Sequence, residues 1–67
     1  MIDWEAFGRM IRKHRLAQNK GIRELARELG MSPATVLRAD RGEPVSTEIF
    51  MTFCEFFLDT PPNQFLV

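Results

Sequence analysis

Apolar positions along the first thirty residues follow the spacing of helix faces. Between about Asp3 and Gln18 they recur three and four residues apart, which places one apolar stripe on a helix that Asp3 can cap. The run 19–21, Asn-Lys-Gly, supplies turn residues after this helix. A second helix is predicted from about Ile22 to Leu29, because Gly30 follows where a helix often ends on a left-handed residue.

The rest of the chain repeats this pattern of cap, helix and breaker. Ser32 and Pro33 predict the N-cap and first position of a third helix that runs to about Asp40. Ser46 predicts the cap of a fourth helix, whose apolar residues at helical spacing are Ile49, Phe50, Phe53, Cys54 and Phe57. Thr60-Pro61 predicts the start of a last helical turn. No stretch alternates with a period of two, so the sequence predicts an all-α, compact five-helix bundle.

Length and composition narrow the class of protein. A chain of 67 residues with 45% hydrophobic residues is expected to form one domain over residues 1–67. The N-terminus carries Asp3 and Glu5 and no long apolar run follows, so we expect a cytoplasmic protein with no membrane partner. One cysteine and one histidine exclude an intrachain disulfide and a zinc site of several Cys and His ligands, and we expect no metal or cofactor.

Charge is distributed unevenly although the formal net charge is zero. Residues 9–41 hold all nine basic residues and three acidic ones, a net charge of +6, and the remainder carries six acidic residues and a charge of −6. The field at a binding face depends on charges within about 8–10 Å at physiological salt. The middle of the chain can therefore bind phosphates.

The stretch 22–42 is the most informative part of the sequence. Two helices can cross steeply at a short turn when the facing residue is small and the turn residue tolerates a positive φ, and Ala26 and Gly30 fit these two places. Other apolar residues would hold the pair together: Leu25, Leu29, Met31 and Val36. This arrangement leaves one face of the third helix outward and able to enter a groove.

This stretch resembles the helix-turn-helix of the Cro and phage-repressor family, also called the XRE family. The resemblance rests on Leu25-Ala26, Gly30, Met31-Ser32, Val36 and Asp40-Arg41-Gly42, extends back to Arg12 and Arg15, and continues into the segment after Pro44. It implies a five-helix domain with a helix-turn-helix motif at about 22–42. It also implies that the third helix lies in the major groove of double-stranded DNA.

The resemblance assigns roles to individual residues. Base-reading positions fall on Pro33, Ala34, Leu37 and Arg38, and only Arg38 can form a hydrogen-bond fork, with the O6 and N7 of a guanine. Phosphate-contacting positions fall on Arg23, Ser32, Thr35 and Arg41. Arg15 and Asp40 match an ion pair that orients the third helix. The apolar Ile22 and the apolar face at 33, 34 and 37 depart from the family pattern, so direct base readout should be sparse and DNA shape should contribute to specificity.

The C-terminal third carries more apolar residues than one helix face can bury. We expect the surplus to form an interface made by Phe56, Leu58, Phe65, Leu66 and Val67. A symmetric homodimer would read a palindromic operator with half-sites about 34 Å apart. The same surface could instead bind another protein, and the sequence leaves that alternative open.

These observations favour a sequence-specific DNA-binding transcriptional regulator, a repressor of bacterial or phage origin that binds its operator as a homodimer. The alternative is a protein-interaction module on the same scaffold, antitoxin-like or regulator-binding, with weak DNA affinity. The zero net charge and the apolar outer face of the third helix motivate that alternative. No paired carboxylates, activated nucleophile or phosphate-binding glycine loop is evident, so we do not expect an enzyme.

Overall fold

Helices form nearly all of the regular structure in the computed structural model, which describes residues 1–67. Four α-helices, α1 (Trp4–Ala17), α2 (Ile22–Leu29), α3 (Pro33–Asp40) and α4 (Thr47–Phe53), precede a π-helical segment, η1 (Cys54–Leu58), and a 3-10 turn, η2 (Pro62–Phe65). The Cα radius of gyration is 10.6 Å, close to the value of about 11 Å expected for a compact chain of this length. The all-α, compact fold is thus confirmed. None of the helices is both long and apolar enough to cross a membrane.

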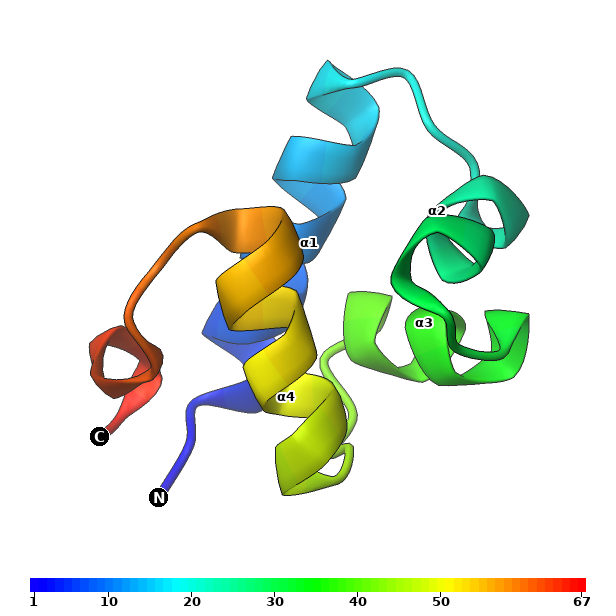
Figure 1. The fold of residues 1–67 in the computed structure, drawn as a ribbon. Coiled ribbons are helices and arrows are strands. Elements are labelled where there is room, and N and C mark those ends of the chain that lie inside the picture. The colour runs from blue at the N-terminus through cyan, green and yellow to red at the C-terminus, as the bar shows by residue number, and fades with distance from the viewer.

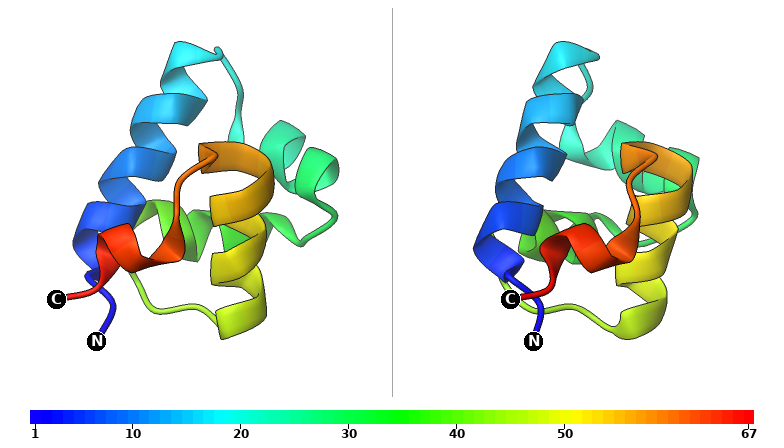
Figure 2. Two further views of the ribbon diagram at one scale, coloured as in Figure 1. Left: turned by 60° about the vertical axis from the view of Figure 1, so that its left-hand side comes forward. Right: turned by 90° about the vertical axis from the view of Figure 1, so that its left-hand side faces the viewer.

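The elements are arranged around α1, the longest helix. In Figure 1, α4 lies in front of α1, and α2 and α3 lie together to one side. The two views of Figure 2 place η2 beside the first turns of α1, with the chain termini next to each other. The termini are joined by backbone hydrogen bonds from Asp3 to Phe65 at 2.7 Å and from Val67 to Met1 at 2.9 Å.

The predicted helix ends agree with the observed ones for the first three helices. Asp3 Oδ1 accepts from the Ala6 N–H at 3.1 Å, and Ser32 and Ser46 cap α3 and α4 through their hydroxyl oxygens. Gly30 ends α2 with a φ of 69°, a conformation that costs glycine little because it has no Cβ. Each of these signals acts within a few residues, which is why the sequence predicts them well.

Aromatic side chains from three elements form the centre of the core. The Phe7 ring of α1 contacts Phe50 and Phe53 of α4, with ring centroids 4.9 and 5.7 Å apart. Phe65 of η2 contacts both Phe7, at 5.3 Å, and Phe50, at 6.0 Å. The Phe7–Phe50 pair is tilted and the other pairs are edge-on, and edge-on aromatic pairs add stability beyond their buried area. They hold α4 and the C-terminal segment against α1.

The prediction of five short helices is wrong at the C-terminal end. Cys54 continues α4 with helical dihedral angles, and the helix widens into η1 before Asp59 ends it at a φ of 50°. The last turn begins at Pro62 and is a 3-10 turn. The Thr60 hydroxyl donates to Leu58 O at 2.9 Å, so it does not cap the last turn as predicted.

Two of the five predicted interface residues belong to the core. Leu58 and Phe65 are each only 4% exposed, because Leu58 lies four residues after the buried Cys54, on the same helix face, and η2 folds Phe65 onto Phe7. Phe56, Leu66 and Val67 are exposed as expected. They do not form one surface, since η1 and the C-terminus lie at different ends of the molecule in Figure 2.

The close approach of α1 to the end of α3 depends on Gly8. A Cβ at Gly8 would lie 2.7 Å from Gly42 N and 2.8 Å from Ala39 O. Both are backbone atoms, so neither can move aside without shifting α3 or the turn after it. Only glycine fits here.

We expect Gly8→Ser to lower the free energy of unfolding by about 1–3 kcal/mol, the usual cost of overpacking, and the Tm by about 4–8 °C per kcal/mol. Serine forms helices better than glycine, so a loss would come from the contact with α3. Urea and thermal unfolding followed by circular dichroism measure both quantities. The control is Gly21→Ser, where the added Cβ meets no atom within 4 Å; equal stability of the two variants would contradict the packing argument.

Candidate nucleic-acid interface

The outer face of α3 is the surface on which the sequence predicts base contacts. Ser32 caps the helix and Pro33 occupies its first turn, where the missing N–H costs little. Val36 and Ala39 are fully buried, so the opposite face points away from the core. That face carries the four predicted base-reading residues, namely the exposed Pro33, Ala34 and Arg38 and the partly exposed Leu37.

α2 supports α3 from behind and leaves this face uncovered. Leu25 and Ala26 are buried between the two helices and the core, and the Met31 N–H donates to Ala26 O at 3.0 Å across the turn. The two helices run in clearly different directions in Figure 1. Ala26 is buried and Gly30 is left-handed, the two features on which the predicted crossing depends.

Three of the four predicted phosphate-contacting residues lie in α3 or at its caps, and the fourth lies in the first turn of α2. Arg23, near the start of α2, and Arg41, at the C-cap of α3, are exposed, and neither side chain forms an ion pair. Ser32 Oγ accepts from the Thr35 N–H at 3.2 Å and lies 2.8 Å from Thr35 Oγ1. Gly21 provides no side-chain cap for α2, so the first N–H groups of that helix are available to an anion.

Asp40 fixes the C-terminal end of α3 to α1. Its side chain is only 2% exposed, and Arg15 Nε donates to Oδ1 at 3.2 Å, which is the pair that the sequence predicts. Arg12 is a second partner, with Nη2 at 2.9 Å and Nε at 3.2 Å from Oδ2. Arg15 also donates from Nη1 to Lys20 O at 3.0 Å. The Arg15 guanidinium therefore connects α1 both to α3 and to the loop that precedes α2.

The second partner of Asp40 was not predicted from the sequence. Arg12 and Arg15 are three residues apart on α1, so they lie on the same helix face. That spacing is a signal for two arginines on one acid. The closely packed Gly8 lies one turn before Arg12 and was also missed; a glycine inside a strongly periodic helix is its only signal.

Arg38 has contacts of its own in the structure. Its Nη2 donates to Pro44 O at 3.2 Å, and its Nε lies 4.0 Å from Glu43 Oε1. The side chain is 60% exposed, so both contacts are open to water and weak. The guanidinium thus leans over the loop between α3 and α4.

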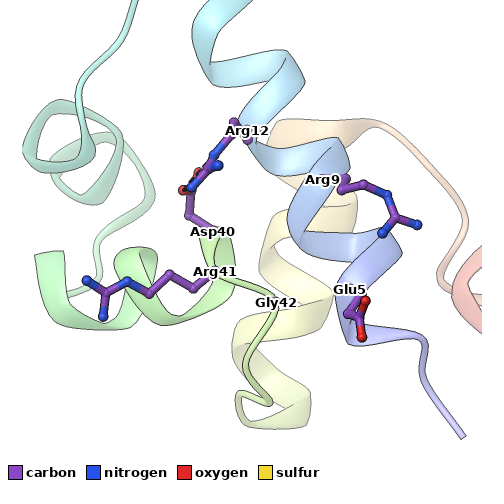
Figure 3. Close-up of a pocket in the computed structure, with 6 residues that line it drawn as sticks. All are labelled: Glu5, Arg9, Arg12, Asp40, Arg41 and Gly42. Carbon is purple, nitrogen blue, oxygen red and sulfur yellow. Dashed lines mark hydrogen bonds and ion pairs between the residues drawn. The ribbon is translucent and has the colours of Figure 1, made fainter.

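A polar recess lies beside the C-terminal end of α3. Its volume is about 310 Å³, none of its lining residues is apolar, and they are Glu5, Arg9, Arg12, Asp40, Arg41 and Gly42. Figure 3 shows Arg9 extending from α1 and Arg41 from the end of α3, with Gly42 between the two elements. Sequence patterns did not group these residues, because α1 and α3 meet only in the folded chain.

The remaining reactive side chains are placed as structural residues. Cys54 is 2% exposed, and its burial raises the pKa of the thiol, which lowers its reactivity. His14 Nδ1 lies 3.0 Å from Met10 O, and its ring lies 6.1 Å from Phe57. No group of three or more His, Cys, Asp or Glu side chains lies close enough together to hold a metal ion.

Compared with known proteins, the chain matches no family model, no curated protein and no solved structure. The resemblance to the Cro and phage-repressor family therefore rests on the residues quoted for it and stays a prediction.

We expect the two partners of Asp40 to contribute unequally to stability. The Arg15 side chain is 14% exposed and that of Arg12 is 56% exposed. Arg15→Gln should cost about 1–3 kcal/mol, as for a charged hydrogen bond shielded from water, whereas Arg12→Gln should cost less than about 1 kcal/mol. Urea unfolding at pH 7 measures the difference, and equal losses for the two variants would contradict it.

Proposed function

We propose that α2, the turn after it and α3 form a helix-turn-helix and that the protein is a sequence-specific DNA-binding transcriptional regulator. The observation that carries this proposal is the uncovered outer face of α3 together with two exposed arginines. Arg23 lies near the start of α2 and Arg41 at the end of α3, and neither forms an ion pair. Such a face suits a groove lined on both sides by phosphates. From the resemblance to Cro-type proteins we further propose that the regulator is a repressor of bacterial or phage origin.

In this proposal α3 lies in the major groove, with its outer face toward the base edges. Arg38 leaves Pro44 O and donates to the O6 and N7 of a guanine. Pro33, Ala34 and Leu37 pack against the bases, most favourably against thymine methyl groups. Arg23, Ser32, Thr35 and Arg41 contact phosphates on either side of the groove and fix the register of the helix.

A homodimer completes the proposal. A two-fold symmetric protein would present two copies of α3 to a palindromic operator with half-sites about 34 Å apart. Exposed apolar side chains are available for such an interface, at Phe56 on η1 and at Leu66 and Val67 beside the N-terminus. These two patches are also places where another protein could bind.

One observation favours a second candidate, a protein-interaction module of the antitoxin-like or regulator-binding kind. The only hydrogen-bonding residue on the outer face of α3, Arg38, already has Pro44 O and Glu43 as partners. The formal net charge of the chain is zero. A module of this kind would use the apolar face of α3 for a protein and would bind DNA weakly.

Binding to random-sequence duplex should separate the two candidates. Log affinity falls with log salt concentration, and each neutralised phosphate makes this slope steeper by about 0.9. Arg23 and Arg41 together therefore predict a slope of about −2 or steeper per subunit. Fluorescence anisotropy titrations at salt concentrations from about 50 to about 200 mM, the range over which phosphate contacts weaken, measure this slope. Binding that is absent at low salt, or indifferent to salt, would favour the interaction module.

Selection of bound duplexes from a random pool tests the base contact. The wild-type chain should show a preference that includes one G·C pair per half-site, and Arg38→Ala should remove the preference at that pair, worth about 1–3 kcal/mol. Arg27→Ala is the matched control, because Arg27 is an exposed arginine of α2 outside the predicted contact set. An unchanged preference in Arg38→Ala would show that Arg38 does not contact a base.

A further inference from the structure

The recess between α1 and the end of α3 contains more arginine than its acidic residues neutralise. Three arginines line it, Arg9, Arg12 and Arg41, against Glu5 and Asp40. Asp40 is buried and receives hydrogen bonds from Arg12 and Arg15, so its charge is already balanced. The other carboxylate, Glu5, forms no ion pair, and neither do Arg9 and Arg41.

Arg9 and Arg41 have unused donors. Neither side chain takes part in an ion pair or a hydrogen bond within the protein. Both are exposed, and Figure 3 shows them extending in opposite directions from the two sides of the recess. Because neither has a partner, turning both inward would break no existing contact. A guanidinium offers a planar set of N–H groups that matches two oxygens of a phosphate. The recess, at about 310 Å³, exceeds the volume of several water molecules of about 30 Å³ each and can admit such a group.

The backbone at the base of the recess is closely packed. Gly42 borders it with a φ of 82°, and its N–H donates to Ala39 O at 3.1 Å. Gly8 packs against the same backbone. The two free arginines therefore extend from a fixed junction of α1 and α3, and an anion bound there would lie at a fixed distance from the outer face of α3.

We propose that this recess binds a phosphate group through Arg9 and Arg41, and that the group is a backbone phosphate of the bound DNA. This inference rests on the proposed function, because Arg41 already belongs to the predicted phosphate set at the end of α3. It extends the contact surface onto the first half of α1 and adds Arg9, which sequence patterns alone did not mark as a ligand.

The first test is the salt dependence of random-duplex binding in Arg9→Gln. The slope of log affinity against log salt should be shallower than that of the wild type by about 0.9. Lys13→Gln is the matched control, because Lys13 is exposed on the same helix, carries the same charge and does not line the recess; it should keep the wild-type slope. Equal slopes for Arg9→Gln and Lys13→Gln would overturn the proposal.

The second test uses inorganic phosphate alone, followed by the NMR resonances of Gly42 N–H and the arginine Nε–H groups. Phosphate should shift these resonances in the wild type and not in Arg9→Gln. Glu5→Gln removes the opposing charge and should raise phosphate affinity by about two- to fivefold, as expected for one exposed charge pair. Absence of any shift in the wild type would overturn the proposal, as would a shift that persists unchanged in Arg9→Gln.

The two tests together distinguish the sources of the phosphate. Phosphate-induced shifts combined with an unaltered duplex slope in Arg9→Gln would overturn the assignment to DNA and identify a site for a free phosphate. A wild-type chain that binds phosphate in the recess but no duplex at any salt concentration would refute the proposed function and the DNA assignment together. A steep wild-type slope that Arg9→Gln does not change refutes only the recess as a DNA contact.

Discussion

The junction between α1 and the C-terminal end of α3 is the constraint on which the position of the outer face of α3 depends. Gly8 lets the two backbones approach to a distance that no Cβ would allow. At that distance Arg12 and Arg15 reach the carboxylate of Asp40. Burying a carboxylate is costly unless strong partners replace its water, so the two arginines favour the orientation of α3 in which they reach Asp40. The same junction fixes the recess beside it.

Local signals explain why most of the fold could be predicted from the sequence. The caps at Asp3, Ser32 and Ser46 and the left-handed Gly30 act within one turn of the chain, and the periodic apolar faces locate the first four helices. The C-terminal end was harder, because its form depends on contacts between distant residues. A π segment and a 3-10 turn have no strong local signature, and Phe65 is buried against Phe7 and Phe50, residues far from it in the sequence.

In the candidate site, too, some features could be predicted from the sequence and others depend on the folded chain. The outer positions of α3 follow from helix geometry once Val36 and Ala39 are assigned to the core, and the pair of Arg15 with Asp40 follows from the resemblance. The contact of Arg38 with Pro44 O depends on the path of the loop after α3, which short-range patterns do not determine. The recess combines residues about thirty positions apart, so only the folded chain brings them together.

The contact of Arg38 with the loop competes with the proposed DNA contact, but only weakly. A solvent-exposed hydrogen bond and an ion pair at 4.0 Å contribute under about 1 kcal/mol, whereas a bidentate pair with guanine contributes about 1–3 kcal/mol of discrimination. The exchange is therefore favourable where a guanine is present and unfavourable elsewhere, since Arg38 then keeps its loop contact. With Pro33, Ala34 and Leu37 unable to donate or accept through their side chains, the proposed complex has one polar base contact per subunit, and the deformability of the operator must supply further specificity.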